Sequence, residues 1–539
     1  MPDRCNPCQS DLAMTARLVI ADRVRTASGI LGDALLIRDG QIAATGWAAD
    51  LRRSDLPEDR FPGSVIIPGL RDAHMHPVPY ALSLLRPTLK DAADLDEVLL
   101  RVRNAAALLP AGEPLIAIRL DDEGLLEQRL PTRHELDLAV DDRPVLVYRY
   151  CGHVAIANTR ALEAAGIGSV AIDPVGGMLD RDGFGVPNGI LRETAIEPVA
   201  TAFSGRSGGP DPDAVLAALH GLITLGLTSL GAILAVGTGP WCDTGNELQA
   251  ILTVARRLPL KLAVLVIARD SDELEQAAIA LDGAGPRLRF LGVKEFADGS
   301  LGGHTAAMGS PYTDQPDQIG TLRLDRSAVG ARARTALRLG GKVAVHAIGD
   351  VANGRVLDLF DELLADGANP GDLRVEHASI LNPEQITRFA GSGVTASVQP
   401  AFMVSEAPWL EKRLGPERLA HAYPLASLTS AGVSLAGGSD CPVEAPHPLW
   451  GMAAARDRGG LVPEEGLSGA QALALFTDNA ALAMGESEPL AVGSPADFVV
   501  LDLDPVEASP DELRRAHVLA TWIDGEAVPF PDNLVTWKG

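Results

Sequence analysis

Short apolar runs alternate with amphipathic stretches through the middle of the chain. Helical periodicity is clearest at residues 327–339, 351–365 and 383–391, which lie between such runs. Eight apolar runs are predicted to be strands, and they end near Leu70, Leu230, Ile267, Val293, Val345, Val375, Val398 and Leu435. Strands that alternate with helices are typical of a parallel sheet, and eight such units predict an α/β fold of the (β/α)8 TIM-barrel type.

Both ends of the chain have a different pattern. Near the N-terminus, apolar runs at 18–22, 33–37 and 41–45 are separated by Gly-containing turns, and runs at 497–502 and 518–523 repeat this pattern near the C-terminus. We therefore expect a small β-sandwich domain formed by both termini. Its parts would be residues 1–66 and 486–539, flanking a barrel over residues 67–485.

The connection between the first two barrel strands is unusually long in sequence. About 150 residues separate them, far more than one connecting helix needs. This stretch has its own strand-like runs at 115–118 and 145–148 and a helix near 159–165. We interpret residues from about 85 to 215 as an insertion subdomain over the barrel mouth, where loops that follow strands build active sites.

Composition narrows the class of protein. The 539 residues include 46 Lys and Arg against 71 Asp and Glu, a net charge of −25, which argues against binding to nucleic acid or to an anionic membrane. Five scattered cysteines are too few for a disulfide framework, and the pair Cys5 and Cys8 is interpreted as incidental within a polar, disordered N-terminal stretch. With no apolar run of membrane-spanning length and no signal-like start, a cytoplasmic protein is expected.

The string Asp72-Ala73-His74-Met75-His76 carries the first chemical signal. It follows the apolar run at residues 64–70. On an extended strand, residues i and i+2 point to the same face, so His74 and His76 aim both imidazoles at one point. Imidazole is the commonest metal ligand among side chains, and the pair therefore predicts a metal-dependent enzyme.

Four later apolar runs also end in a residue suited to metal chemistry. These residues are Lys294, His346, His377 and Asp440. Each alone has an ordinary explanation, such as a hydrogen-bonded structural histidine, a solvated lysine or a helix-capping aspartate. Catalytic groups of a TIM barrel come from the C-terminal ends of several strands, and the joint occurrence favours a metal site there.

The residue types indicate how such a site would act. Imidazoles and carboxylates suit a borderline cation such as Zn²⁺, and a metal-activated water becomes a nucleophile near neutral pH. Asp440 is the expected general acid/base. A protonated lysine is a poor ligand, so Lys294 must be modified, unusually deprotonated or not a ligand.

At this point the chain resembles a known family, the amidohydrolase superfamily, and within it the amidohydrolase-3 branch that includes enzymes similar to N-substituted formamide deformylase. Besides the His-x-His pair, the matching strings are residues 292–302, 345–350, 375–378, 438–443, 152–153 with 157–158, 189–193 and 496–501. The resemblance implies a metal-dependent hydrolase that cleaves a C–N bond of amide, N-formyl or N-acyl type in a small molecule.

The resemblance also implies an arrangement of one or two metal ions. Lys294 would be N6-carboxylated by CO₂ and would bridge two ions, of which His74, His76 and Asp440 hold one and His346 and His377 the other. The alternatives are a deaminase with a single metal, which has no need of Lys294, and a non-enzymatic barrel relative, which predicts missing ligands.

Three further residues are expected to bind substrate. His153 and Arg192 lie in the insertion and either reach over the site or stabilise the insertion's own loops. His304 stands where the branch commonly has Arg, which suggests a changed substrate preference. Glu295, next to Lys294, is expected to face the other way and form a structural salt bridge. A homodimer is the default for a large enzyme of this kind.

Overall fold

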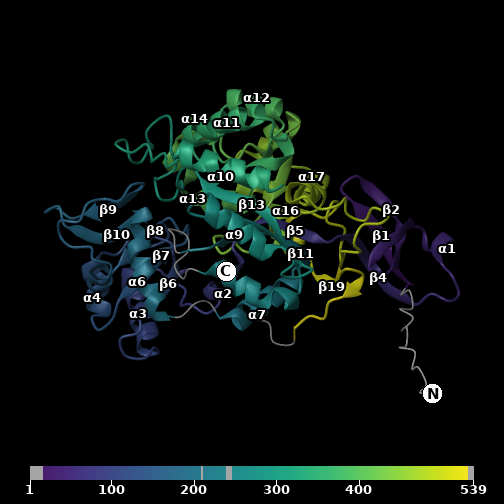
Figure 1. Cartoon of the computed structure of the whole chain (residues 1–539), viewed down its shortest axis with the longest axis horizontal. Coiled ribbons are helices and arrows are strands. Elements are labelled where there is room, and N and C mark those ends of the chain that lie inside the picture. The colour runs from purple at the N-terminus through teal and green to yellow at the C-terminus, as the bar shows by residue number, and fades with distance from the viewer. Residues whose placement is uncertain (1–15, 208–210, 238–245, 532–539) are drawn as a thin grey trace, which may run out of the picture.

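The structure, a computed structural model, describes residues 16–207, 211–237 and 246–531. It has a central barrel, with the insertion on the left of Figure 1 and a sheet formed by both termini on the right. The predicted disordered stretch and the Cys5/Cys8 pair lie outside the described residues.

Eight parallel strands form the central sheet. They follow one another in sequence order, as in a TIM barrel. The strands are β5 (Leu70–Met75), β11 (Leu227–Ala235), β12 (Lys261–Ile267), β13 (Leu288–Phe296), β14 (Lys342–Ala347), β15 (Leu373–His377), β16 (Thr395–Val398) and β17 (Leu435–Gly437). The predicted eight-stranded α/β architecture is confirmed.

Contacts between the first and last strands close the barrel. The Asp440 N–H, just beyond β17, donates to the His74 carbonyl of β5 at 2.8 Å, and the Ser439 N–H donates to Asp72 Oδ1 at 3.0 Å. A Cβ atom on Gly438 would lie 2.7 Å from the His74 nitrogen. Glycine at 438 therefore permits the approach that brings Asp440 beside His74.

The expected position of the first barrel strand is wrong. The apolar run at 64–70 belongs mostly to β4 (Glu58–Pro68) of the terminal sheet, and β5 begins only at Leu70. Residues 64–75 are all buried, so hydrophobicity does not mark the point where the chain leaves one sheet for the other. That point is Pro68-Gly69, since proline lacks the N–H that a ladder needs. His74 consequently lies within a barrel strand and not after one.

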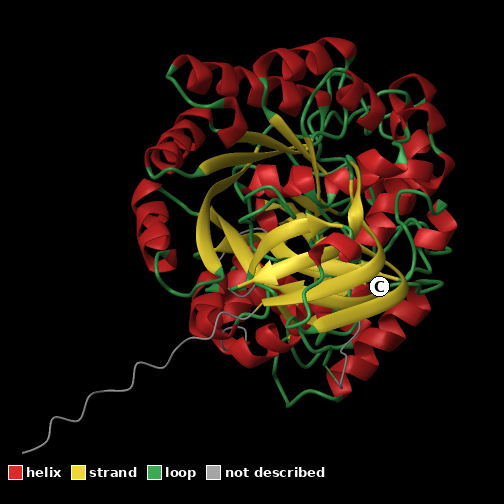
Figure 2. Ribbon diagram, turned by 90° about the vertical axis from the view of Figure 1, so that its right-hand side faces the viewer, coloured by secondary structure: helices red, strands yellow, loops and turns green. Residues whose placement is uncertain are grey.

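Helices surround the barrel (Figure 2). The three predicted helices are present as α10 (Arg326–Arg338), α11 (Asp350–Ala365) and α12 (Pro383–Ser392). Asn382 and Gln385 form a capping box at the start of α12, and Gly393 ends it with a positive φ of 69°. Other helices around the barrel are α2 (Pro77–Ser83), α7 (Pro212–Ile223), α8 (Glu247–Val254), α9 (Ser271–Leu281), α13 (Phe402–Leu414), α15 (Leu425–Ser430), α16 (Pro448–Asp457), α17 (Gly469–Leu475) and α18 (Asp478–Met484).

The two termini share one curved seven-stranded sheet. In order across the sheet, its strands are β20 (Glu526–Ala527), β19 (Val518–Ile523), β18 (Phe498–Leu501), β4, β1 (Ala16–Thr26), β2 (Gly29–Arg38) and β3 (Gln41–Gly46). The turn at Gly40 contacts the turn at Asp524 and Gly525, which lie near the opposite edge of the sheet. The sheet thus curls around its own core, where Phe498 stacks on Trp522.

The insertion forms a separate five-stranded sheet. Its strands, in order, are β6 (Leu115–Leu120), β7 (Val145–Arg149), β8 (Val154–Ala157), β10 (Pro187–Glu193) and β9 (Gly177–Arg181). Its helices are α3 (Leu95–Ala107), α4 (Arg133–Ala139), α5 (Thr159–Ala164) and α6 (Glu197–Ser207).

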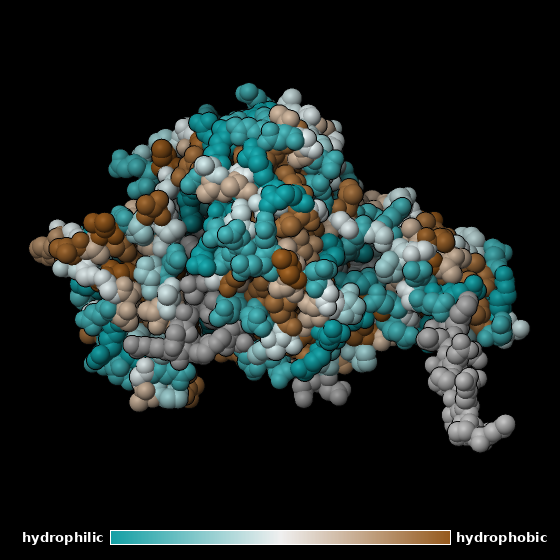
Figure 3. Space-filling model, viewed as in Figure 1, coloured by the Kyte–Doolittle hydropathy of each residue, from teal (hydrophilic) through white to brown (hydrophobic). Residues whose placement is uncertain are grey.

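Apolar side chains on the surface lie mostly in small groups among polar ones, with one group at the outer end of the insertion (Figure 3). Val170, Ile172, Val175 and Phe184 are strongly exposed in this part of the chain. Within the described part of the chain, every helix is too short or too polar to cross a bilayer.

Candidate active site

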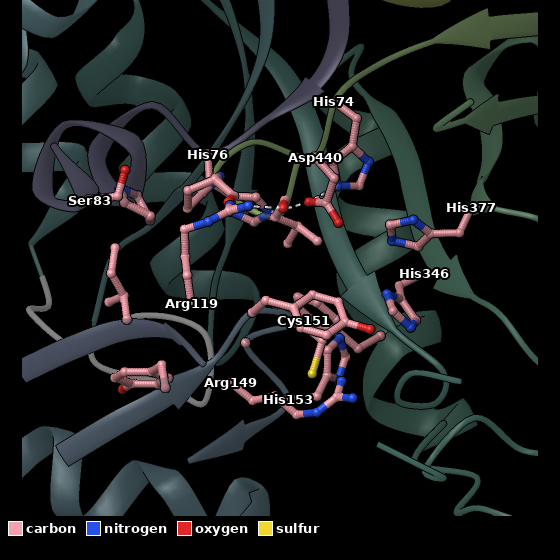
Figure 4. Close-up of a pocket in the computed structure, with 18 of the residues that line it drawn as sticks. His74, His76, Ser83, Arg119, Arg149, Cys151, His153, His346, His377 and Asp440 are labelled. Atoms are coloured by element: carbon pink, nitrogen blue, oxygen red, sulfur yellow. Dashed lines mark hydrogen bonds and ion pairs between the residues drawn. The ribbon is translucent and has the colours of Figure 1, made fainter. Parts of the chain in front are cut away.

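One cavity collects the barrel residues predicted from strand ends. His74, His76, Lys294, His346, His377 and Asp440 all line it, together with insertion residues from Ile118 to His153. Its volume is about 900 Å³ including its opening to solvent, within the range of small-molecule sites. In Figure 4, Arg149, Cys151 and His153 lie on one side of the cavity, opposite His74 and Asp440.

His74 is held by a buried ion pair. Its Nδ1 lies 2.5 Å from Glu376 Oε2, and the other oxygen of Glu376 accepts from Arg374 Nε at 2.5 Å. Arg374 also donates to the Ala73 carbonyl at 2.8 Å. Despite burial, Arg374 and His74 hold the pKa of Glu376 well below its usual range. An ionised Glu376 accepts a hydrogen bond from Nδ1–H and leaves Nε2 of His74 facing the cavity.

Two more histidines are oriented in the same way by buried acceptors. His377 Nδ1 lies 2.7 Å from Gln399 Oε1, and His346 Nε2 lies 3.0 Å from the Gly299 carbonyl and 3.3 Å from Asp298 Oδ1. Burial lowers the pKa of both imidazoles well below 6.5, so they are neutral. Each proton sits on the bonded nitrogen, and the lone pair of the other nitrogen is available.

Asp440 lies where these lone pairs converge. Its Oδ1 is 3.2 Å from Nε2 of both His74 and His76. Burial opposes its charge, but His74, His76 and His377 hold its pKa well below 3.8. Ligand atoms of His74, His377 and Asp440 all lie within 4.8 Å of one another.

A carboxylate oxygen facing an imidazole nitrogen that has no proton needs a cation between them. Burial opposes a proton on His74, but Asp440 and Glu376 outweigh it and raise the His74 pKa. A proton or a divalent ion therefore satisfies this pair, and the donor set of neutral imidazoles and a carboxylate fits a divalent metal.

Lys294 and Glu295 point to opposite faces of β13, as expected for successive strand residues. Lys294 faces the cavity, where its Nζ lies 3.7 Å from the centre of the Phe296 ring. Burial lowers the pKa of Lys294 to about 8. Glu295 forms a bidentate pair with Arg332 of α10, with one contact at 2.7 Å, which confirms the predicted salt bridge.

The backbone at two of these residues is in a sparsely populated conformation. His377 has φ of 73° and Asp440 has φ of 55°, values that side-chain-bearing residues seldom adopt. His377 is the last residue of β15, and Asp440 lies in the loop just beyond the end of β17 at Gly437. Such strain persists only where the surroundings impose it, and it concentrates at functional sites.

The insertion supplies the facing wall of the cavity. His153 is held by Glu193, with Nδ1 3.1 Å from Oε1, and its ring centre lies 5.5 Å from that of His346. Arg119 Nη1 donates to the carbonyls of Pro442 and Val443 at 2.7 and 3.1 Å. The insertion is therefore joined to the loop that follows Asp440.

Two residues expected to bind substrate lie outside the cavity lining. Arg192 forms a bidentate pair with Asp180, at 2.8 and 2.7 Å, and donates to the Gly303 carbonyl at 2.9 Å. His304 bonds Asp314, with Nε2 3.1 Å from Oδ1. The motif strings place both residues near the mouth, but their charged partners turn the side chains toward the supporting loops.

Several residues that shape the site were not predicted. Glu376, Gln399 and Asp72 orient ligating groups or close the barrel. Gln399 directly follows the strand that ends at Val398, so the strand-end pattern would have found it. Arg149 is the last residue of β7, and the same pattern applied to the insertion sheet would have found it also.

Comparisons with known proteins identify the family of the chain. The N-substituted formamide deformylase of Arthrobacter pascens is 29% identical over 543 residues, with 94% of this chain and 97% of that protein covered. The Bacillus subtilis protein YtcJ is 31% identical over 513 residues, covering 92% and 96%. An uncharacterized metal-dependent hydrolase from Pyrococcus horikoshii superposes with a TM-score of 0.73 at 27% identity, covering 92% and 99%. The model of the amidohydrolase family matches residues 62–529, and the chain belongs to this family.

Proposed function

We propose that the protein is a zinc-dependent hydrolase that cleaves the C–N bond of an amide, N-formyl or N-acyl group in a small molecule. The observation that carries this proposal is the convergence of ligand atoms from His74, His377 and Asp440 within 4.8 Å, in a cavity that also contains a buried lysine. The similarity to a formamide deformylase supports C–N cleavage as the reaction.

The same cavity contains two more histidines, His76 and His346, which complete two sets of ligands when the cluster of three is divided between two ions. His76 faces Asp440, and the His346 ring centre lies 4.5 Å from that of His377. We assign His74, His76 and Asp440 to one ion and His346 and His377 to another. Lys294, which lines the same cavity, would bridge them once its Nζ is carboxylated. A buried amine with a pKa of about 8 is partly neutral near neutral pH, and the neutral amine is the form that reacts with CO₂.

The residues of the chain then have separate roles in the reaction. A bound divalent ion supplies Lewis-acid chemistry, which lowers the pKa of water and polarises a carbonyl. Asp440, ionised and at the centre of the cluster, accepts a proton from the attacking water and returns it to the leaving nitrogen. His153 lies across the cavity from His346 and binds the substrate on the insertion side.

The proposal is tested on full-length protein loaded with zinc and bicarbonate. A panel of N-formyl and N-acyl amines should yield acid and amine in equal amounts, and activity should disappear with a chelator. Asp440→Asn should keep bound metal but lose about 1,000-fold in kcat, the scale of lost general acid–base catalysis. Ammonia released from an amine substrate, with activity retained in Lys294→Ala, would instead identify the single-metal deaminase.

A further inference from the structure

The insertion places Arg149 at the cavity wall, with no conventional hydrogen-bond acceptor for its two terminal nitrogens among the residues that the structure describes. Arg149 has a side chain that is only 1% exposed, and it lines the cavity that contains the metal-ligand cluster. Its Nε donates to Asp122 Oδ1 at 2.5 Å. Neither Nη1 nor Nη2 has an oxygen or nitrogen hydrogen-bond partner in the described part of the chain, and the thiol of Cys151, a weak acceptor, is the remaining polar contact of the side chain. A buried donor that makes no hydrogen bond lowers the stability of the fold, so these atoms indicate a missing acceptor.

The surroundings fix this guanidinium in place. Asp122 holds the Nε edge, and the guanidinium carbon lies 4.4 Å from the centre of the Tyr150 ring. A Cβ on residue 302 would lie 2.5 Å from Nη1, so glycine at 302 leaves the space that the guanidinium occupies. Arg149 therefore keeps its two terminal nitrogens in a fixed position at the wall of the cavity, enclosed by its neighbours.

A second unused polar group lies beside the first. The Tyr150 hydroxyl is buried and has no hydrogen-bond partner among the described residues. It lines the same cavity, and a Cβ on residue 302 would lie 3.2 Å from this hydroxyl too. The guanidinium edge and this hydroxyl together offer three donors near one point.

The charge of the cavity wall restricts the ligand. Arg86, Arg119, Arg149 and Lys294 line the cavity, whereas Asp440 is the single carboxylate among the described lining residues. The chain as a whole has a net charge of −25. A cationic wall in an acidic protein favours an anion, and the planar fork of arginine matches a carboxylate bidentately.

We infer that Arg149 and Tyr150 form a subsite for a carboxylate, so that the substrates are amides that also bear a carboxylate group. The inference rests on the proposed hydrolase function for the bond that is cleaved, but not for binding of the carboxylate itself. No covalent step is added, because the subsite only orients the substrate.

Matched substrates test the subsite by activity. N-formylglycine and N-acetylglycine are compared with the corresponding glycinamides, and succinic acid monomethylamide places the carboxylate on the acyl side instead. The wild type should prefer acids by about 100-fold in kcat/KM, the scale of a lost charged hydrogen-bond pair. Arg149→Met should remove this preference by slowing the acids while changing the amides less than about threefold.

Two further variants keep the test interpretable. Arg149→Lys keeps a charge beside Asp122 but lacks the fork, and it should lose about tenfold on acids. Arg143→Met removes another buried arginine of the insertion, one that pairs with Asp142 away from the cavity, and the acid-to-amide ratio should not change. Equal loss on acids and amides in both Arg149 variants, or no acid preference in the wild type, would overturn the inference.

Binding without turnover separates this inference from the proposed function. In the Asp440→Asn background, calorimetric titration should show N-acetylglycine binding at least about tenfold more tightly than N-acetylglycinamide, and Arg149→Met should abolish the difference. If this binding difference is found but the wild-type protein hydrolyses no amide of the panel, the subsite stands and the hydrolase proposal is refuted. Hydrolysis by the wild type, with no difference in affinity between N-acetylglycine and N-acetylglycinamide, would support the hydrolase proposal and refute the subsite.

Discussion

The two walls of the cavity are built in different ways. On the barrel side, six side chains come from the ends of strands β5, β13, β14, β15 and β17, and buried partners such as Glu376 and Gln399 fix the orientation of the histidines. On the insertion side, Arg149, Tyr150 and His153 come from the end of β7 and the segment that follows it. The barrel topology therefore positions the metal-ligand cluster, while the inserted sheet provides the facing wall of the cavity.

The largest expected effect falls on the barrel wall. Lys294→Ala should lower kcat/KM by about 1,000-fold or more, because several kcal/mol of charge stabilisation depend on the bridging group. Short carboxylic acids added to the variant should restore part of the activity. The control is Glu295→Gln on the same strand, which removes the charge of the buried pair with Arg332 on the other face of the strand; it should lower stability, but kcat/KM of the folded variant should stay within about threefold. Full activity in Lys294→Ala would refute the bridging role.

The next effect tests the support behind His74. Glu376→Gln should weaken metal affinity by about 10–100-fold, since residues that orient ligating histidines have effects of this size. It also leaves Arg374 buried without its anion, so the free energy of unfolding should fall by about 3–5 kcal/mol. Competition with a metal-binding dye measures the first quantity and urea unfolding the second. Unchanged metal affinity in a folded variant would contradict this role.

Loading of the site should depend on pH. Lys294, whose pKa burial lowers to about 8, becomes reactive toward CO₂ as the pH rises through that value. Burial opposes a proton on His74, but Asp440 and Glu376 raise its pKa, so at lower pH a proton competes with the metal. At a fixed concentration of dissolved CO₂, activation with zinc should be about 20-fold slower at about pH 6.5 than at about pH 8.5. A rate independent of pH would count against a neutral Lys294 as the reactive form.

The smallest expected effect concerns two residues near the insertion wall whose side chains do not line the cavity. Arg192→Lys and His304→Gln should change kcat/KM by less than about threefold, because neither side chain lines the cavity. They should instead reduce thermal stability through the lost pairs with Asp180 and Asp314. A change of substrate preference in either variant, comparable with that of Arg149→Met, would show that the cavity boundary differs from the one described.

Much of the fold was predictable because the barrel strands after the first are apolar runs with distinct ends. The strand-end pattern also located Lys294, His346, His377 and Asp440, since the carboxyl ends of parallel strands meet at one face of the barrel. It failed between β4 and β5, where both strands are buried and only Pro68-Gly69 marks the change of sheet.

The insertion side was less predictable for a physical reason. Arg192, His304 and Arg149 are all cationic or polar residues near the mouth, and sequence alone does not show which carboxylate each will meet. Asp180 and Asp314 turn the first two away, whereas Asp122 holds only one edge of Arg149 and leaves the other in the cavity. Partner choice in loops depends on tertiary contacts that no local pattern encodes.

The metal content of the full-length protein decides most directly whether this cluster is a metal centre. After loading with zinc and bicarbonate and extensive dialysis, mass spectrometry of the metal should find about one to two ions per chain in the wild type and in His304→Gln. The double variant His74→Ala/His377→Ala should retain almost none. A folded wild-type protein that holds no zinc, or a double variant that holds as much as the wild type, would contradict the account.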